Sequence, residues 1–329
     1  MDPSPSPCSG VLGVMRAALG VVSEALGILW EALRIPARNC KLSLAVLTLV
    51  LVPYSLLHLA YFFALASLSP AYLTANVHPL RIPTLRLRPV ERTQPHVAMD
   101  DDASLAAVVA AIEVAFYIVQ VYTVLSTIHA AYATYSDEYL SVAELFRRMR
   151  GNWKGPVATQ LYVTILSIGY THFLDLLFDA GASIALMAPG ALLALPAYVL
   201  YMYLGVVWTA GLAASVAEGG GGLQALGAAQ VVVRGRLLQG FLISLWSLVA
   251  SLAVTGMMEG LLLLVESTTT ATQVAAGLVL TDVEQVVYMF TLVAFTVFYL
   301  DCRRRHGGLA ADGGLDSYRR LAHGPPPQC

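Results

Sequence analysis

The stretch LSLAVLTLVLVPYSLLHLAYFFALASL, residues 42–68, contains no Asp, Glu, Lys or Arg. A helix of about 20 apolar residues is long enough to cross the roughly 30 Å hydrocarbon core of a bilayer. The run is therefore a predicted membrane-spanning helix. Composition agrees, since 57% of the 329 residues are hydrophobic and 12% are charged, against about 25% charged in a typical soluble domain.

Further apolar runs of this kind follow along the chain, and together they predict an all-α, polytopic membrane helix bundle with six transmembrane helices arranged as three hairpins. In the fourth run we expect a break near Pro189–Gly190, because proline interrupts helical hydrogen bonding. Residues 11–303 are predicted to form a single membrane domain, between a disordered segment at 1–10 and a disordered cytosolic tail at 304–329. The six expected spans are about 42–68, 105–135, 157–178, 191–216, 241–265 and 283–300.

Lys and Arg are unevenly distributed around these spans. With a cytosolic N-terminus, every segment that faces the cytosol carries basic residues, whereas the short outer loops near 180–182 and 267–281 carry none. The long outer loop near 69–103 has arginines, but its acidic residues offset them. The positive-inside rule therefore predicts that both termini are cytosolic. We expect the protein in the endomembrane system or the plasma membrane.

A shorter or more polar helix is predicted before each odd-numbered span. In the first, about 11–35, polar or glycine residues recur every three or four positions, which is typical of a helix lying in the membrane interface, and Pro36 is expected to end it. The second, about 142–150, begins with a capping box formed by Ser141 and Glu144. The third, about 223–234, follows GGGG at 219–222, which we interpret as a flexible linker. The polar stripe of the first helix comprises Arg16, Gly20, Glu24, Gly27, Glu31 and Arg34.

The turns that follow these helices are similar to one another. RMRGNWKG at 148–155 resembles VVRGRLLQG at 232–240, and LRIPARNCK at 33–41 is a looser third copy. This layout resembles a plant family of uncharacterised six-span membrane proteins. It is also similar to the bacterial membrane domain that is fused to glycerophosphodiester phosphodiesterases. The resemblance implies a fold without an activity, because the soluble catalytic barrel of those fusions is absent from this chain.

Basic and aromatic residues next to the spans are candidates for contact with anionic lipid headgroups on the cytosolic side. They are Arg147, Arg148, Arg150, Trp153, Lys154, Arg234, Arg236, Arg303, Arg304 and Arg305. Cys40 and Cys302 also lie beside spans, where a cysteine is either a palmitoylation site or an unmodified thiol.

Ionisable residues inside spans are candidates for a functional polar cavity, because a charge in hydrocarbon is costly. The candidates are His58, Glu113, His172, Asp175 and Glu259. They either surround a shared cation or proton site that opens to the outer side, or they lie at the outer interface, where a charge costs little.

Enzyme motifs such as H-E-x-x-H, G-x-S-x-G and the Walker loop do not occur in the chain. We therefore expect a non-enzymatic protein without cofactor or metal, which organises or assists membrane components through lipid-bound amphipathic helices. The alternative is a small-solute or ion transporter that uses the acidic residues near the outer side. Membrane lipids are the expected partners, with membrane proteins or self-association as further partners and no nucleic acid.

Overall fold

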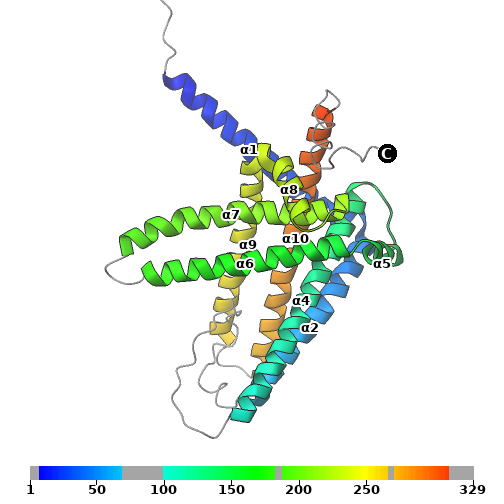
Figure 1. Cartoon of the computed structure of the whole chain (residues 1–329), viewed down its shortest axis with the longest axis vertical. Coiled ribbons are helices and arrows are strands. Elements are labelled where there is room, and N and C mark those ends of the chain that lie inside the picture. The colour runs from blue at the N-terminus through cyan, green and yellow to red at the C-terminus, as the bar shows by residue number, and fades with distance from the viewer. Residues whose placement is uncertain (1–6, 69–98, 182–186, 266–269, 311–329) are drawn as a thin grey trace, which may run out of the picture. The chain divides into compact units, whose positions relative to one another are not determined.

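The structure is a computed structural model, and it describes residues 7–68, 99–181, 187–265 and 270–310 (Figure 1). Within these ranges the chain is helical with short connections and no strand. The helices are α1 (Pro7–Arg38), α2 (Cys40–Leu68), α4 (Met99–Tyr135), α5 (Val142–Gly151), α6 (Lys154–Gly181), α7 (Met187–Glu218), α8 (Leu223–Val233), the 3-10 helix η1 (Arg234–Arg236), α9 (Leu237–Val265) and α10 (Thr270–Ala310). The all-α fold class is confirmed for this part of the chain.

Five stretches of helix among the described residues are long and apolar enough to cross a membrane. The protein is therefore a multi-pass membrane protein by the length and composition of its helices. The helix at the third expected span, α6, is not among the five. The five stretches are Cys40–Ala64, Ala107–Tyr135, Leu195–Glu218, Leu223–Met257 and Val274–His306.

Several helices are longer than the sequence predicts. Helix α1 begins at Pro7, inside the segment expected to be disordered, and α10 continues to Ala310, past the expected end of the membrane domain. Pro36 does not end α1, which continues to Arg38. Proline removes one hydrogen bond from a helix and its ring crowds the carbonyl four residues earlier, which can kink a helix without ending it.

The expected break near Pro189 is also absent. Helix α7 begins at Met187, so Pro189 lies in its first turn. The N–H groups of a first turn have no carbonyl partner within the helix, and proline is therefore tolerated there.

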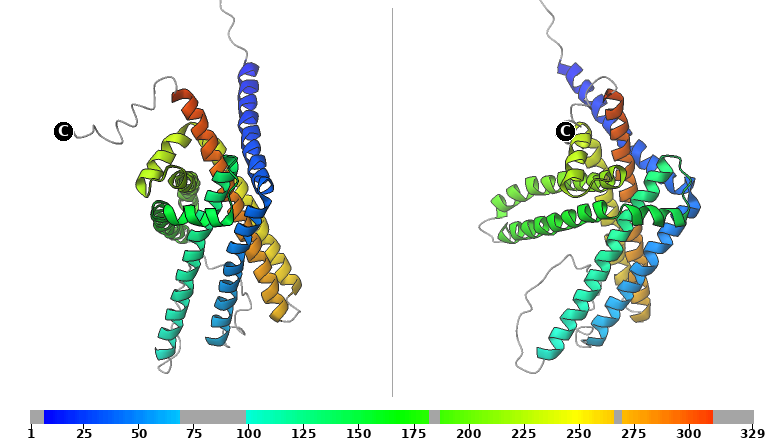
Figure 2. Two further views of the ribbon diagram at one scale, coloured as in Figure 1. Left: turned by 90° about the vertical axis from the view of Figure 1, so that its right-hand side faces the viewer. Right: turned by 45° about the vertical axis from the view of Figure 1, so that its right-hand side comes forward.

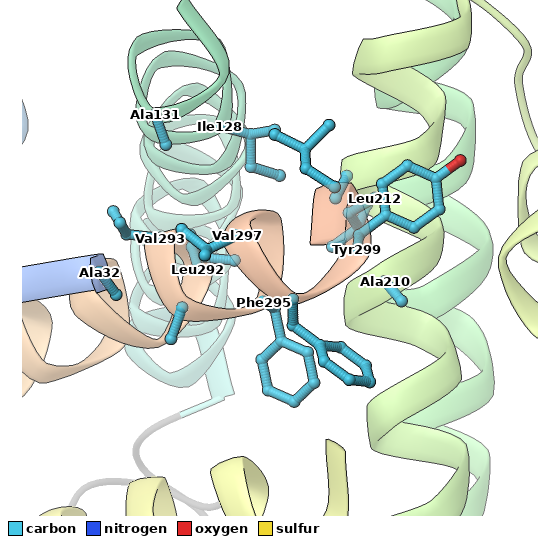
Figure 3. Close-up of a cluster of buried hydrophobic side chains, with 14 of the residues drawn as sticks. Ala32, Ile128, Ala131, Ala210, Leu212, Leu292, Val293, Phe295, Val297 and Tyr299 are labelled. Carbon is cyan, nitrogen blue, oxygen red and sulfur yellow. The ribbon is translucent and has the colours of Figure 1, made fainter. Parts of the chain in front are cut away.

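The described chain divides into two compact units, of which the first contains residues 7–46, 124–181, 187–250 and 288–310. Its core draws on α1, α4, α7, α8, α9 and α10 (Figure 3). Phe298 and Tyr299 of α10 are fully buried in this core. Small residues on α7 allow close approach, and a Cβ at Gly211 would lie 2.5 Å from Cδ2 of Leu226 on α8. This close helix contact at Gly211 is thus made within the chain.

Helices α6 and α7 run antiparallel, side by side, and lie across α10 within this unit (Figures 1 and 2).

The second unit contains residues 47–68, 99–123, 251–265 and 270–287. It consists of the remaining parts of α2, α4, α9 and α10, and many of its apolar side chains are exposed, such as Leu56 and Phe63 of α2. Exposed apolar side chains on long helices are expected where lipid is the solvent.

Candidate functional site

The first unit contains a network of polar side chains that joins segments far apart in sequence. Arg236 of η1 pairs with Glu24 of α1 and with Asp301 of α10, and its side chain is only 13% exposed. Gln239 of α9 donates a hydrogen bond from Nε2 to Glu24. Arg305 approaches the same two acids, at 3.7 Å from Glu24 and 3.4 Å from Asp301. We call these five residues the polar network.

A cavity of about 280 Å³ lies beside the polar network. Glu24, Gly27 and Glu31 of α1 line it, together with Tyr135 at the end of α4. The other charged residues in its wall are Arg236 of η1 and Asp301 and Arg305 of α10. Glu31 also pairs with Arg38 at 2.5 Å. The cavity therefore has charged groups of both signs in its wall.

Helix α1 presents three different faces. One face is buried in the core through Ala25, Ile28, Leu29, Ala32 and Ile35. The polar stripe expected from the sequence runs beside it, and its two acids face the cavity. A third face is apolar and exposed, and we call it the exposed α1 face. It consists of Met15, Leu19, Val22, Leu26, Trp30 and Leu33, which are 42–65% exposed.

The short helix α5 starts as the sequence predicts. The hydroxyl of Ser141 accepts a hydrogen bond from the backbone N–H of Glu144 at 3.2 Å. Leu145 and Met149 are buried, while Val142 and Phe146 are exposed. The helix thus buries one apolar side and leaves aromatic and basic side chains on the surface.

Ion pairs occupy some of the basic residues around α5. Arg147 pairs with Glu144 at 2.5 Å, and this hydrogen bond lowers the pKa of the Glu144 carboxyl. Arg148 pairs with Glu138 at 2.7 Å. Arg150, Trp153 and Lys154 are exposed, so they remain free to meet a charged surface.

We call the similar segments at 148–155 and 232–240 the basic turns, and each contains two glycines. The second glycine of each lies where another segment approaches closely. A Cβ at Gly155 would lie 2.9 Å from the carbonyl oxygen of Gly220, and one at Gly240 would lie 2.6 Å from Cγ1 of Val206. The first glycines of these turns, Gly151 and Gly235, have open space around them. The repeated motif therefore marks two sites of close packing.

The interpretation of GGGG as a flexible linker is wrong. Gly219 and Gly222 have positive φ values of 71° and 63°, which glycine adopts without strain. The N–H of Gly222 donates to the hydroxyl of the fully buried Thr159 at 2.9 Å. Gly221 packs on the backbone of Gly155. The four glycines form an ordered turn against the start of α6.

The other predicted headgroup residues have different surroundings. Arg234 is exposed, whereas Arg236 belongs to the polar network. Arg303 lies 3.8 Å from Glu218, and the guanidinium of Arg304 stacks 4.6 Å from the centre of the Tyr135 ring. Arg236 is thus engaged with two carboxylates and is not directed toward a headgroup.

The two candidate cysteines also differ. Cys40 is exposed, but Cys302 is buried, with 1% of its surface exposed. A buried thiol is not accessible for acylation, so palmitoylation of Cys302 does not fit this structure.

The residues of the predicted polar cavity lie in different surroundings. In the second unit, the ring of His58 packs against Phe116 at 4.6 Å, its Nδ1 lies 3.1 Å from the carbonyl oxygen of Tyr54, and Glu113 is exposed. In the first unit, His172 and Asp175 are exposed on α6. The side chain of Glu259 lies outside the described residues.

A different acid in the second unit has a close polar partner. Asp282 of α10 accepts a hydrogen bond from the hydroxyl of Ser55 on α2 at 2.7 Å. No group of three or more His, Cys, Asp or Glu side chains that could hold a metal occurs in the described part of the chain. The described candidates His58, Glu113, His172 and Asp175 thus form no such group with one another.

Sequence reasoning missed the polar network. Glu24 appears in the sequence as part of a surface stripe, and Arg236 as part of a basic turn. The one signal for their pairing is Asp301, an acid at the end of an apolar segment, two residues before the basic run at 303–305.

Comparison with protein families gives one match. The model described as a domain of unknown function, DUF8558, matches residues 19–309. The chain belongs to the DUF8558 family. The matched range includes the polar network, the basic turns and the helices of both units, apart from the first part of α1 and the last residue of α10. No curated protein and no solved structure matches the chain.

Proposed function

We propose that this DUF8558 protein is a non-enzymatic membrane protein that organises or assists other membrane components through helices bound to the lipid surface. The observation that carries the proposal is the exposed α1 face. Six large apolar side chains on one side of a helix are rarely left in water. Arg34 stacks on Trp30 at 5.4 Å, and a tryptophan beside a basic residue suits the headgroup layer.

The proposed topology has six spans in three hairpins, with both termini in the cytosol and each hairpin preceded by an amphipathic interfacial helix. Helices α1, α5 and α8 precede α2, α6 and α9 in the described chain, which supports this order. Because α6 and α7 run antiparallel, side by side (Figure 1), we take them to cross the membrane as a pair. That pairing keeps both termini on the same side in the proposed topology.

The lipid partners are anionic headgroups on the cytosolic side. Arg150, Lys154 and Trp153 lie together after α5 and are exposed. Each basic residue near an anionic membrane surface contributes about 1 kcal/mol to binding. Helices α1 and α5 would thus add apolar and electrostatic attachment to that of the spans.

The role of the exposed α1 face can be tested by making it polar. A variant with Leu19→Gln, Leu26→Gln and Leu33→Gln should recover at least about tenfold fewer membrane proteins and bound lipids on isolation in native nanodiscs, because covering one leucine is worth about 1.5–3 kcal/mol. The matched control is Arg16→Gln, Gly20→Gln and Ser23→Gln, on the exposed polar side of the same helix.

Both variants leave the buried face of α1 unchanged, so both should stay in the membrane fraction. Equal recovery of lipids and membrane proteins with the two variants would refute the proposed role of this face.

A further inference from the structure

We propose that the first part of α1, residues 7–23, recognises packing defects in the bilayer, which are gaps between lipid headgroups that expose acyl chains. Such gaps are frequent where a leaflet is strongly curved or where both chains of its lipids are unsaturated. We call residues 7–23 the free arm. Recognition of such gaps rests on the proposed function, because it requires the exposed α1 face to lie in lipid.

The free arm extends beyond the part of α1 that packs on the rest of the first unit. Among the described side chains of α1, the buried ones begin at Ala25, and the preceding Glu24 belongs to the polar network. From residue 15 to residue 23 every residue is exposed, apart from the half-buried Val21. Figure 1 shows the arm projecting away from the other helices of the unit. At 1.5 Å per residue it continues for about 25 Å beyond the polar network.

The free arm has little to hold it in helical form in water. It contains three glycines and four valines, which are weak helix formers. Most helical stability in proteins comes from the packing of one apolar side of the helix. The large apolar side chains Met15, Leu19 and Val22 of the arm are instead 59%, 65% and 42% exposed. A bilayer supplies the missing cover, so insertion and helix formation support each other.

Charge contributes little to the attraction between the free arm and a membrane. Arg16 is the one charged side chain of the arm, and the exposed Gly20 and Ser23 lie on the same polar side. The next charged residue, Glu24, is already paired with Arg236. One basic residue near an anionic surface strengthens binding about fivefold, whereas covering one leucine strengthens it at least about tenfold. Insertion of apolar side chains therefore decides whether the arm binds.

A helix that binds in this way responds to how tightly the lipids pack. Its apolar side lies about 5–10 Å deep, at the boundary between headgroups and acyl chains, and its binding depends on curvature and lipid composition. A polar side of small, uncharged residues forms few headgroup contacts, so it cannot offset the work of opening a tightly packed leaflet. The exposed Arg150 and Lys154 after α5 instead suit anionic headgroups. Two surfaces of the protein then respond to two different properties of the membrane.

The test uses the full chain in nanodiscs, whose two faces are both open to solvent, so the orientation of the chain does not matter. Cys8→Ser, Cys40→Ser and Cys329→Ser remove the other reactive thiols, since Cys302 is buried. An environment-sensitive fluorophore is then attached through Leu19→Cys, and its emission gives the ratio of inserted to free arm.

The bilayers are dioleoylphosphatidylcholine, which packs loosely, and palmitoyl-oleoyl-phosphatidylcholine with cholesterol, which packs tightly. Each is also prepared with a third of its phospholipid replaced by phosphatidylserine with the same acyl chains. We expect the ratio to be at least about tenfold higher in the loosely packed bilayer, which corresponds to the cover of one leucine. Adding phosphatidylserine should change it by no more than about fivefold, the effect of Arg16 alone.

Dependence on charge can be introduced by combining Gly20→Lys with Ser23→Lys. Both positions are exposed, and a Cβ at Gly20 meets no atom within 4 Å. With two more basic residues, phosphatidylserine should raise the ratio about 25-fold more than it does for the original protein. The matched control combines Gly20→Gln with Ser23→Gln, which keeps the polar side uncharged and should respond to phosphatidylserine as the original protein does.

Equal insertion in the loosely and the tightly packed bilayers would overturn the recognition of packing defects. It would leave the proposed function intact if position 19 lies in lipid in both. A larger response to phosphatidylserine than to packing, or a lysine variant that responds to this lipid no more than the glutamine variant, would also overturn the recognition of packing defects. A label that stays in water in every bilayer would overturn it together with the proposed role of the exposed α1 face.

Discussion

Replacing Arg236 with alanine should lower the free energy of unfolding by about 2–3 kcal/mol. Removing one partner of a fully buried ion pair costs about 3–5 kcal/mol, because the other charge is left without a partner. Here the loss is smaller, since Glu24 and Asp301 are 42% and 29% exposed and still have Arg305 nearby. The change is measured by thermal or denaturant unfolding in a mild detergent.

The matched control for Arg236 is Arg234→Ala. Arg234 lies in the same 3-10 helix but is exposed, so its replacement should change stability by less than about 0.5 kcal/mol. Arg236→Lys should fall between the two, because lysine keeps the charge but cannot reach both acids with one planar group. Equal stability of the Arg234 and Arg236 alanine variants would show that the polar network does not hold α1 to η1 and α10.

Replacing Gly221 with alanine should destabilise the first unit by about 3 kcal/mol, at the upper end of the usual cost of overpacking. The added Cβ would lie 2.7 Å from the Cα of Gly155 and 3.1 Å from its carbonyl oxygen. Both neighbours are backbone atoms at the start of α6, so no side chain can rotate away. Relief would require the ordered glycine turn to move as a whole. The measurement is the shift in the thermal unfolding midpoint.

Gly220→Ala is the control within the same turn. A Cβ at Gly220 meets no atom within 4 Å, and alanine reduces the conformational freedom of the unfolded chain. Stability should therefore stay within about 0.5 kcal/mol of the original or rise slightly. If Gly221→Ala is tolerated as well as Gly220→Ala, then GGGG is the flexible linker that the sequence suggests.

The sequence predicts most of the helices because their signals are local. Apolar runs mark the helices at the expected spans, and the Ser141 hydroxyl caps α5 as expected. Two of the errors concern proline, since neither Pro36 nor Pro189 interrupts its helix. Pro36 removes one hydrogen bond, and a helix held by tertiary packing can tolerate that loss. Pro189 lies in a first turn, where no bond within the helix is lost.

The polar network is not predictable in the same way. Glu24 and Arg236 are separated by more than 200 positions, and nothing local to either residue reveals its partner. The crossing of α6 and α7 over α10 likewise depends on the shape of packed surfaces. Sequence pattern identified the polar stripe of α1, but which of its residues face inward follows from the three-dimensional structure.

The central claim is that the exposed α1 face lies in lipid, and nitroxide scanning of α1 tests it most directly. The background is Cys8→Ser, Cys40→Ser and Cys329→Ser, since the buried Cys302 is not accessible to the label. One label is placed with Leu26→Cys on the exposed α1 face and another with Gly20→Cys on the polar stripe. Power saturation in anionic liposomes then compares collisions with oxygen, which concentrates in lipid, and with a water-soluble nickel chelate.

The account predicts that the label at position 26 collides mainly with oxygen and the label at position 20 mainly with the nickel chelate. A label at position 26 that collides mainly with the chelate, or with neither reagent, would contradict it.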